Sequence, residues 1–226
     1  MIYNKTKPCW ALLGLDAPYD SLDIKEIKAL CLKKGPPGFV IAADGGYDLV
    51  ESLGFCPNAV IGDMDSMPDE KRKSLEKRNV PVIVYPTEKD KTDSHLALEF
   101  AKNAGYSEII LVGALGGRLD HTIANIYMMA SHLRDSVLCE VRLIGGGHEA
   151  VISESQTTIT GKPGEIVSLI PLTPTVEGIT ITGFYYPLYD AALKYGETVG
   201  VSNYLKETTA FVCIRSGTLL ILRHYR

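Results

Sequence analysis

The chain has 226 residues, of which 46% are hydrophobic and 22% charged, and its formal net charge is −4. This length and composition predict one or two soluble globular domains with a substantial hydrophobic core. A mildly acidic chain without a basic stripe is poorly suited to nucleic acid as its main partner, because phosphate backbones demand basic patches.

The cysteines and the apolar runs indicate the cellular compartment of the protein. The five cysteines are scattered without the spacing of a zinc or redox motif, which favours small core hydrophobes in a reducing compartment. Residues 1–10 lack the long apolar stretch of a signal peptide, and no apolar run approaches the ~18 residues of a membrane span. We therefore expect a cytoplasmic protein without a membrane partner.

Up to about residue 146, short apolar runs alternate with helical patterns. In chain order, the expected strands are 10–15, 39–43, 59–61, 80–85, 108–112 and 137–144. The expected helices between them are 23–34, 47–53, 69–77, 93–103 and 120–133. This alternation predicts a mostly parallel, Rossmann-like α/β sheet with helices on both faces.

Beyond residues 145–147, valine, isoleucine and threonine become dense and helical periodicity fades. The expected strands, separated by turn residues, are 157–160, 166–170, 179–182, 210–214 and 219–222. Repeated short strands predict an antiparallel β-sandwich. We therefore expect an α/β domain over residues 1–146 and a C-terminal β-sandwich domain over residues 147–226.

Acidic or glycine-rich clusters follow four successive strands of the expected parallel sheet. The carboxyl ends of such strands share one edge, and ligands bind in the crevice there. The edge therefore gathers five aspartates with basic side chains among them: Asp44, Asp63, Asp65, Asp90 and Asp93, with Lys89, Arg118 and His121.

These residue types point to a polyphosphate with a bound metal ion. Asp63 and Asp65 stand two apart on extended backbone, so their carboxylates point the same way and repel unless a cation lies between them. Oxygen ligands of this kind suit Mg²⁺, which takes one or two carboxylates together with phosphate oxygens and water. Glycines admit phosphate to backbone amides, and Lys89 and Arg118 would neutralise the charge on a moving phosphoryl group.

Each cluster also has a purely structural interpretation. Asp44-Gly45-Gly46 can be a plain tight turn, and residues 113–117 a tight connection. Thr92 can simply cap the helix that begins at Asp93, and His121 can be an ordinary hydrogen-bonded histidine. Neither a Walker A loop nor a Gly-x-Gly-x-x-Gly after the first strand is present. The coincidence of clusters at four successive strand ends favours function.

The ordered set of motifs resembles the thiamine pyrophosphokinase, or thiamine diphosphokinase, family. Each motif alone is weak, but the set in this order is specific, and it covers nearly the whole chain. The motifs are Asp44-Gly45-Gly46, Gly62-Asp63-Met64-Asp65-Ser66, Asp90-Lys91-Thr92-Asp93, Gly116-Gly117-Arg118-Leu119-Asp120-His121 with Asn125, and, in the second domain, residues 167–172, 183–188 and Gly200-Val201-Ser202-Asn203.

The resemblance implies a transferase of thiamine diphosphate biosynthesis, a kinase that moves a pyrophosphoryl group from ATP to the hydroxyethyl oxygen of thiamine and releases AMP. It implies dependence on Mg²⁺ and a homodimer, with thiamine between the catalytic domain of one subunit and the β-domain of the other.

The resemblance also implies roles for individual residues, carried over by motif. The metal ligands would be Asp63, Asp65, Asp90 and Asp93, which with Arg118 form the catalytic set. The nucleotide-binding residues would be Asp44, Gly45, Gly46, Lys89, Thr92, Gly116, Gly117, Asp120, His121 and Asn125. Thiamine would meet Ser202 and Asn203, with Tyr204 as the candidate for the aromatic ring that stacks on its pyrimidine.

The chain departs from the family pattern at two points near the expected nucleotide. Tyr47-Asp48 stand where the family usually has a small residue and Asn, and Ser94-His95 where it usually has an apolar residue and Glu. Two other functions stay open: a pyrophosphokinase of the same fold that acts on another alcohol such as a pterin, and a non-catalytic nucleotide-binding module. The sequence determines neither the general base nor the preferred nucleotide donor.

Overall fold

The structure of the protein is a computed structural model that describes residues 10–63, 67–86, 90–134 and 139–225. The chain divides into two compact units, residues 1–146 and residues 147–226. Within the described ranges, no helix combines the length and apolar character needed to cross a membrane.

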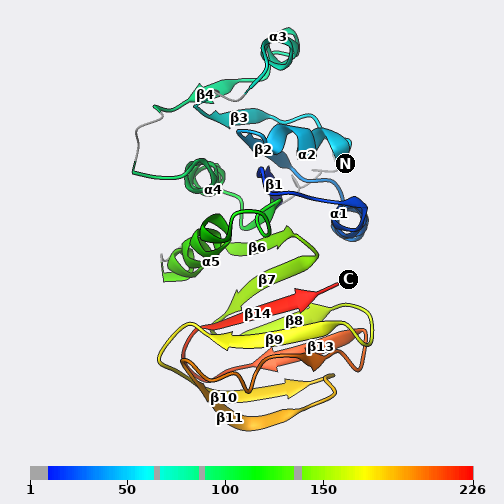
Figure 1. The fold of residues 1–226 in the computed structure, drawn as a ribbon, viewed down its shortest axis with the longest axis vertical. Helices are drawn as coiled ribbons and strands as arrows, with labels where there is room; N and C mark the ends of the chain where they lie inside the picture. Colours follow the sequence, from blue (N-terminus) through cyan, green and yellow to red (C-terminus); the bar gives the residue numbers. More distant parts are fainter. Residues whose placement is uncertain (1–9, 64–66, 87–89, 135–138, 226) are drawn as a thin grey trace, which may run out of the picture. The chain divides into compact units, whose positions relative to one another are not determined.

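The first unit is a parallel sheet with helices packed on it (Figure 1). Its strands are β1 (Trp10–Gly14), β2 (Phe39–Ala43), β3 (Ala59–Gly62), β4 (Val82–Val84), β5 (Glu108–Val112) and β6 (Glu140–Gly145). Its helices are α1 (Ser21–Lys34), α2 (Gly46–Ser52), α3 (Asp69–Lys77), α4 (Asp93–Asn103) and α5 (Leu119–Arg134). The strands lie in the order β6-β5-β1-β2-β3-β4, and all neighbouring pairs are parallel, which confirms the predicted fold class.

Burial explains why the strands of this sheet are easily recognised in the sequence as apolar runs. Every residue of β1 is buried, as are four of the five residues of β5, because central strands of a parallel sheet are covered on both faces. β4 lies at the edge of the sheet and is only partly buried. It is shorter than the predicted strand 80–85, because Pro81 and Pro86 flank it and proline cannot donate to the ladder.

The second unit consists of two antiparallel sheets. Its strands are β7 (His148–Ser153), β8 (Gln156–Thr160), β9 (Ile166–Pro171), β10 (Thr175–Thr182), β11 (Leu188–Lys194), β12 (Asn203–Tyr204), β13 (Thr209–Cys213) and β14 (Leu219–His224). They lie in the orders β12-β9-β14-β7 and β11-β10-β13-β8. Both sheets contribute to one apolar core, which includes Val151 and Ile221 from the first and Ile159 and Val212 from the second. This arrangement confirms the predicted antiparallel sandwich.

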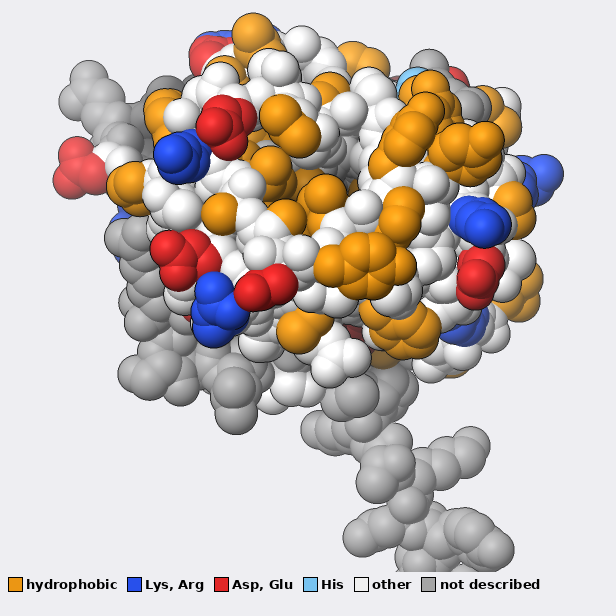
Figure 2. All heavy atoms as spheres, turned by 90° about the horizontal axis from the view of Figure 1, so that it is seen from below, with side chains coloured by type: hydrophobic (Ala, Val, Ile, Leu, Met, Phe, Trp, Pro, Cys, Tyr) orange, Lys and Arg blue, Asp and Glu red, His pale blue; other side chains and the backbone are white. Residues whose placement is uncertain are grey.

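Exposed aromatic side chains are a further feature of the second unit. Figure 2 looks onto the end where β10 and β11 lie and shows hydrophobic side chains gathered across the middle of that face. The exposed tyrosines of the unit are Tyr185, Tyr186, Tyr189, Tyr195 and Tyr204.

The prediction that the cysteines fill the core is wrong for Cys56 and Cys213, which are exposed, whereas Cys139 is buried.

Candidate active site

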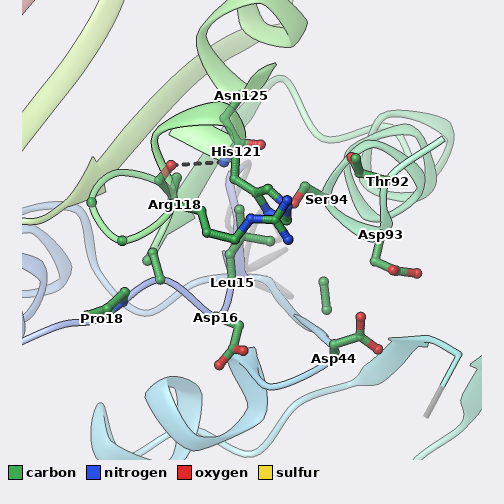
Figure 3. A pocket seen from close by; sticks show the side chains of 16 residues that line it. Leu15, Asp16, Pro18, Asp44, Thr92, Asp93, Ser94, Arg118, His121 and Asn125 are labelled. Atoms are coloured by element: carbon green, nitrogen blue, oxygen red, sulfur yellow. Dashed lines mark hydrogen bonds between the residues drawn. The ribbon is translucent and has the colours of Figure 1, made fainter. Parts of the chain in front are cut away.

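A pocket of about 540 Å³ lies in the first unit, at the carboxyl ends of β1, β2 and β5 (Figure 3). Its volume is in the range of small-ligand sites, and its place is the crevice where open α/β sheets bind ligands. The N-terminal turns of α4 and α5 also contribute to it. The lining residues are Leu15, Asp16, Ala17, Pro18, Ala43, Asp44, Thr92, Asp93, Ser94, Gly113, Ala114, Gly116, Gly117, Arg118, His121 and Asn125.

The pocket brings together many of the residues selected from the sequence, although they come from three separate motifs. Those in its lining are Asp44, Thr92, Asp93, Gly116, Gly117, Arg118, His121 and Asn125. Gly45 lines a smaller adjoining pocket, and Gly46 is buried in the first turn of α2. Asp63, Asp90 and Asp120 lie outside the lining, and Asp65 and Lys89 fall outside the described residues.

Glycines allow the strand ends around the pocket to approach one another closely. A Cβ atom on Gly46 would overlap the backbone carbonyl of Gly14, and one on Gly113, whose φ is +66°, would overlap that of Leu15. Residues 44 and 45 do form a turn, with Asp44 at a φ of +45°. The tight-turn interpretation is therefore correct, and the same turn carries the Asp44 side chain to the pocket.

The loop that carries Arg118 is anchored to α5. Asn125 is buried, and its Nδ2 donates to the Ala114 carbonyl at 2.9 Å, the bond drawn in Figure 3. Thr122 Oγ1 donates to the Gly116 carbonyl at 3.2 Å. These bonds hold the glycine-rich loop against the helix. The Asn125 amide thus has a structural role beside its predicted contact with nucleotide.

Arg118 is held by a carboxylate two residues along the chain. Its Nε donates to Asp120 Oδ1 at 3.1 Å and its Nη2 to Asp120 Oδ2 at 2.6 Å. Both side chains are exposed, so the pair contributes little to stability but fixes the fork of the guanidinium beside the pocket. A phosphate could replace the Asp120 carboxylate as the partner of this guanidinium, because two phosphate oxygens can accept the same pair of hydrogen bonds.

This pair gives a testable pKa. The hydrogen bond from Arg118 lowers the pKa of the Asp120 carboxyl from its ordinary 3.8 to about 2. Because the pKa is lowered, the stabilisation from the pair is present above pH ~3.8 and is lost as the pH falls towards ~2. Following the Asp120 carboxyl carbon by NMR should give a midpoint near 2 in the wild type and near 3.8 in Arg118→Met. A midpoint near 3.8 in both proteins would show that the pair does not form in solution.

The N-terminus of α4 gives the pocket a second polar wall. Thr92 caps this helix, as predicted, since its Oγ1 accepts from the His95 N–H at 3.3 Å. Asp93 and Ser94 follow in the first turn and line the pocket. A helix N-terminus of this kind favours an anion, because the N–H groups of its first turn and its dipole point outward.

Two comparisons with known proteins decide the family. Residues 37–140 match the model of the thiamin pyrophosphokinase catalytic domain, and residues 152–219 match the model of the thiamin pyrophosphokinase vitamin B1 binding domain. The chain is also 30% identical to the thiamine pyrophosphokinase of Bacillus subtilis over 185 residues, which cover 81% of this chain and 86% of that relative. The chain belongs to the thiamine pyrophosphokinase family.

Solved structures of thiamine pyrophosphokinases resemble the whole chain. The crystal structure from Bacillus subtilis superposes with a TM-score of 0.79 at 25% identity and covers 96% of this chain and 98% of its own. The crystal structure from Geobacillus thermodenitrificans gives a TM-score of 0.76 at 26% identity, with 96% and 97% covered. Both domains of the family fold are therefore present here.

The pocket chemistry fits the Mg²⁺ that the thiamine pyrophosphokinase resemblance implies. Asp16 and Asp44, which follow β1 and β2, and Asp93, in the first turn of α4, line the same pocket, and carboxylate oxygens are the ligands that Mg²⁺ prefers. In the part of the chain that the structure describes, no three His, Cys, Asp or Glu side chains form a ready-made metal cluster. Mg²⁺ does not need such a cluster, because it usually takes one or two carboxylates and completes its coordination shell with phosphate oxygens and water. The ligand set Asp63, Asp65, Asp90 and Asp93 stays a prediction.

Asp16 is a pocket residue that the sequence analysis missed. It lies two residues beyond β1, is exposed, and lines both the main pocket and the smaller one beside it. A Cβ atom on Gly45 would meet its carboxylate. The signal was available, since Asp16 follows a buried strand as the other aspartates do, but only a glycine motif was sought after the first strand.

In the vitamin B1 binding domain, the predicted substrate residue Asn203 hydrogen-bonds to backbone through both the oxygen and the nitrogen of its side-chain amide. Its Oδ1 accepts from the N–H groups of Tyr186 at 3.1 Å and Tyr204 at 2.8 Å, and its Nδ2 donates to the Tyr186 carbonyl at 2.7 Å. Asn203 thus ties residues 184–186 to β12. Ser202 has a φ of +64°, and its N–H donates to Ser168 Oγ at 3.1 Å.

The same contacts add two aromatic residues to the candidate thiamine site. The Tyr185 N–H donates to the Tyr204 carbonyl at 2.9 Å, and the rings of Tyr185 and Tyr186 meet edge to face with centroids 5.2 Å apart. Tyr185, Tyr186 and Tyr204 are all exposed. The sequence analysis recognised residues 183–188 as a motif but assigned the stacking role only to Tyr204.

Proposed function

We propose that this protein transfers the pyrophosphoryl group of ATP to the hydroxyethyl oxygen of thiamine, with thiamine diphosphate and AMP as products. The observation that carries this proposal is the pocket at the strand ends of the catalytic domain, lined by acidic, glycine-rich and basic segments in the family's order. In this proposal, residues 1–146 bind ATP and metal and residues 147–226 bind thiamine.

The reaction is an in-line displacement at the β-phosphorus of ATP. A bond forms between the thiamine oxygen and the β-phosphorus, the bond from that phosphorus to the α,β-bridging oxygen breaks, and AMP leaves with the bridging oxygen. The hydroxyl proton passes to a carboxylate of the pocket or to water. Positioning and charge neutralisation carry most of the catalysis in such transfers.

The pocket residues supply both of these effects. The guanidinium of Arg118 would leave Asp120 for the phosphate oxygens, and the backbone amides of Gly116 and Gly117 would donate to them. The N-terminus of α4 would add its favourable dipole. His121 would donate a hydrogen bond to the same group of oxygens.

The aspartates would hold the metal ion that this reaction needs. Asp63, Asp65, Asp90 and Asp93 would be the ligands, directly or through water. When bound, Mg²⁺ neutralises charge on the β- and γ-phosphates and on the leaving oxygen.

The thiamine site and the assembly are further parts of the proposal. Thiamine would rest against the exposed tyrosines beside Ser202 and Asn203, because aromatic rings stack on flat heterocycles. The family resemblance supports a cytoplasmic homodimer in which thiamine lies between the catalytic domain of one subunit and the β-domain of the other.

An assay of products tests the proposal. Incubating the protein with ATP, Mg²⁺ and thiamine should yield AMP and thiamine diphosphate in equal amounts, measured by chromatography. Omission of thiamine or addition of EDTA should abolish both products. AMP formed with a pterin alcohol but not with thiamine would favour the other pyrophosphokinase. A thermal shift with nucleotide but without any AMP would favour the non-catalytic binding module.

A further inference from the structure

A second, smaller hollow adjoins the main pocket. Its volume is about 250 Å³, and it shares two lining residues, Asp16 and Asp44, with the larger pocket. We call this hollow the annex. Its full lining is Asp16, Asp44, Gly45, Asp48, Met67, Pro68 and Lys71. The two hollows meet over the shared carboxylates, so one elongated ligand can extend from the main pocket into the annex.

The outer wall of the annex is an ion pair between two helices. Asp48 lies in the first turn of α2 and Lys71 in the first turn of α3, and Lys71 Nζ donates to Asp48 Oδ1. The same ammonium lies 5.8 Å from the centroid of the Tyr47 ring. That ring is buried, and its hydroxyl donates to Glu51 Oε1 at 2.6 Å. Lys71 is thus held beside the annex by a carboxylate and a fixed aromatic face.

The lining of the annex is unsuited to phosphate. It presents three carboxylates, Asp16, Asp44 and Asp48, against a single ammonium. The main pocket also has three carboxylates and one cation, but it adds the loop of Gly116 and Gly117 and the N-terminus of α4, so a polyphosphate chain is better neutralised there. Ionised carboxylates only accept hydrogen bonds, so they suit hydroxyl and amino groups, and an acidic side chain is a common partner of ribose hydroxyls. Met67 and Pro68 add apolar surface for a flat ring.

We propose that the annex binds the nucleoside half of the donor nucleotide, with Asp48 and Lys71 as its specificity-determining residues. This inference rests on the proposed function and places the polyphosphate in the main pocket, beside Arg118 and the N-terminus of α4. The Asp48 carboxylate accepts a hydrogen bond from a donor group of the nucleoside, and the Lys71 ammonium donates a hydrogen bond to an acceptor group of the nucleoside.

Binding measurements on two variants test the proposal. Calorimetry would compare ATP with inorganic triphosphate, each with Mg²⁺, on the wild type, Lys71→Met and Asp48→Ala. Both variants should bind ATP at least about tenfold more weakly, because each loses a hydrogen bond to a charged group. Their affinity for inorganic triphosphate should equal that of the wild type. Lys73→Met, on the same helix and exposed, is the matched control and should change neither affinity.

Two outcomes would overturn the proposal. Equal weakening for ATP and triphosphate would place phosphate, not nucleoside, beside Lys71. Unchanged ATP affinity in both variants would leave the annex outside the nucleotide site. Because the readout is binding without turnover, an absence of thiamine diphosphate formation would count against the proposed function and not against this inference.

Discussion

Replacing Asp93 by asparagine is expected to lower the turnover number with ATP and thiamine by about 100-fold or more. Asp93 is half-buried in the first turn of α4 and lines the main pocket, where Figure 3 shows its carboxylate near that of Asp44. Asparagine keeps the shape but removes the negative charge that would hold Mg²⁺ against the phosphates. Steady-state kinetics at saturating ATP, thiamine and Mg²⁺ would measure the loss.

The control for this variant is Asp69→Asn. Asp69 also lies in the first turn of a helix, α3, but it is exposed and lines neither pocket. Both variants should lose at most about 1 kcal/mol of stability from the helix dipole, which thermal unfolding would check. Turnover near the wild-type value in Asp93→Asn would remove Asp93 from the metal site.

From the sequence, Asp65→Asn carries the same expectation of a loss in turnover number above about 100-fold, although Asp65 lies outside the described residues.

Replacing Arg118 by methionine is expected to lower the turnover number by about 100- to 1,000-fold. Its guanidinium is the cation that the described residues place in the lining of the main pocket, and it is already aligned by the two hydrogen bonds that it donates to Asp120. Charge develops on phosphate oxygens as the pyrophosphoryl group moves, and a positioned guanidinium stabilises it. Arg118→Lys should recover only part of the rate, because lysine cannot make the bidentate contact.

A charge-matched surface change separates this effect from a general loss of positive charge. Lys28→Met, on the exposed face of α1, should leave the turnover number unchanged. If Arg118→Met kept more than half of the wild-type turnover, the guanidinium would not act on the phosphates. Its role would then be limited to the pair with Asp120.

Much of the candidate site could be read from the sequence because the signals are local. The strands β1, β2, β3 and β5 are short apolar runs that end in glycine or are followed directly by aspartate or glycine, and the carboxyl ends of parallel strands must share an edge. Asp44, Asp93 and Arg118, from three different motifs, accordingly meet in one pocket.

Other parts of the fold carried no such signal. The sequence analysis missed β7, β11 and β12. β11 contains Asp190, Ala191 and Ala192, which are poor strand formers, and it exists because it pairs with β10. β12 has two residues and is defined by its pairing with β9. Such strands are stabilised by pairing with another strand, so the propensity of their own residues could not identify them.

The sequence by itself determined the fold class, the family and the edge of the sheet where the chemistry belongs, because periodicity, turn residues and motif order are properties of neighbouring residues. Only the tertiary structure showed that Asp16 lines the pocket and that the Asn203 side-chain amide hydrogen-bonds to the backbone of Tyr186. It also showed that Lys71 of α3 forms an ion pair with Asp48 of α2. These contacts depend on how closely packed elements approach one another, and that distance is set by side chains far apart in the sequence.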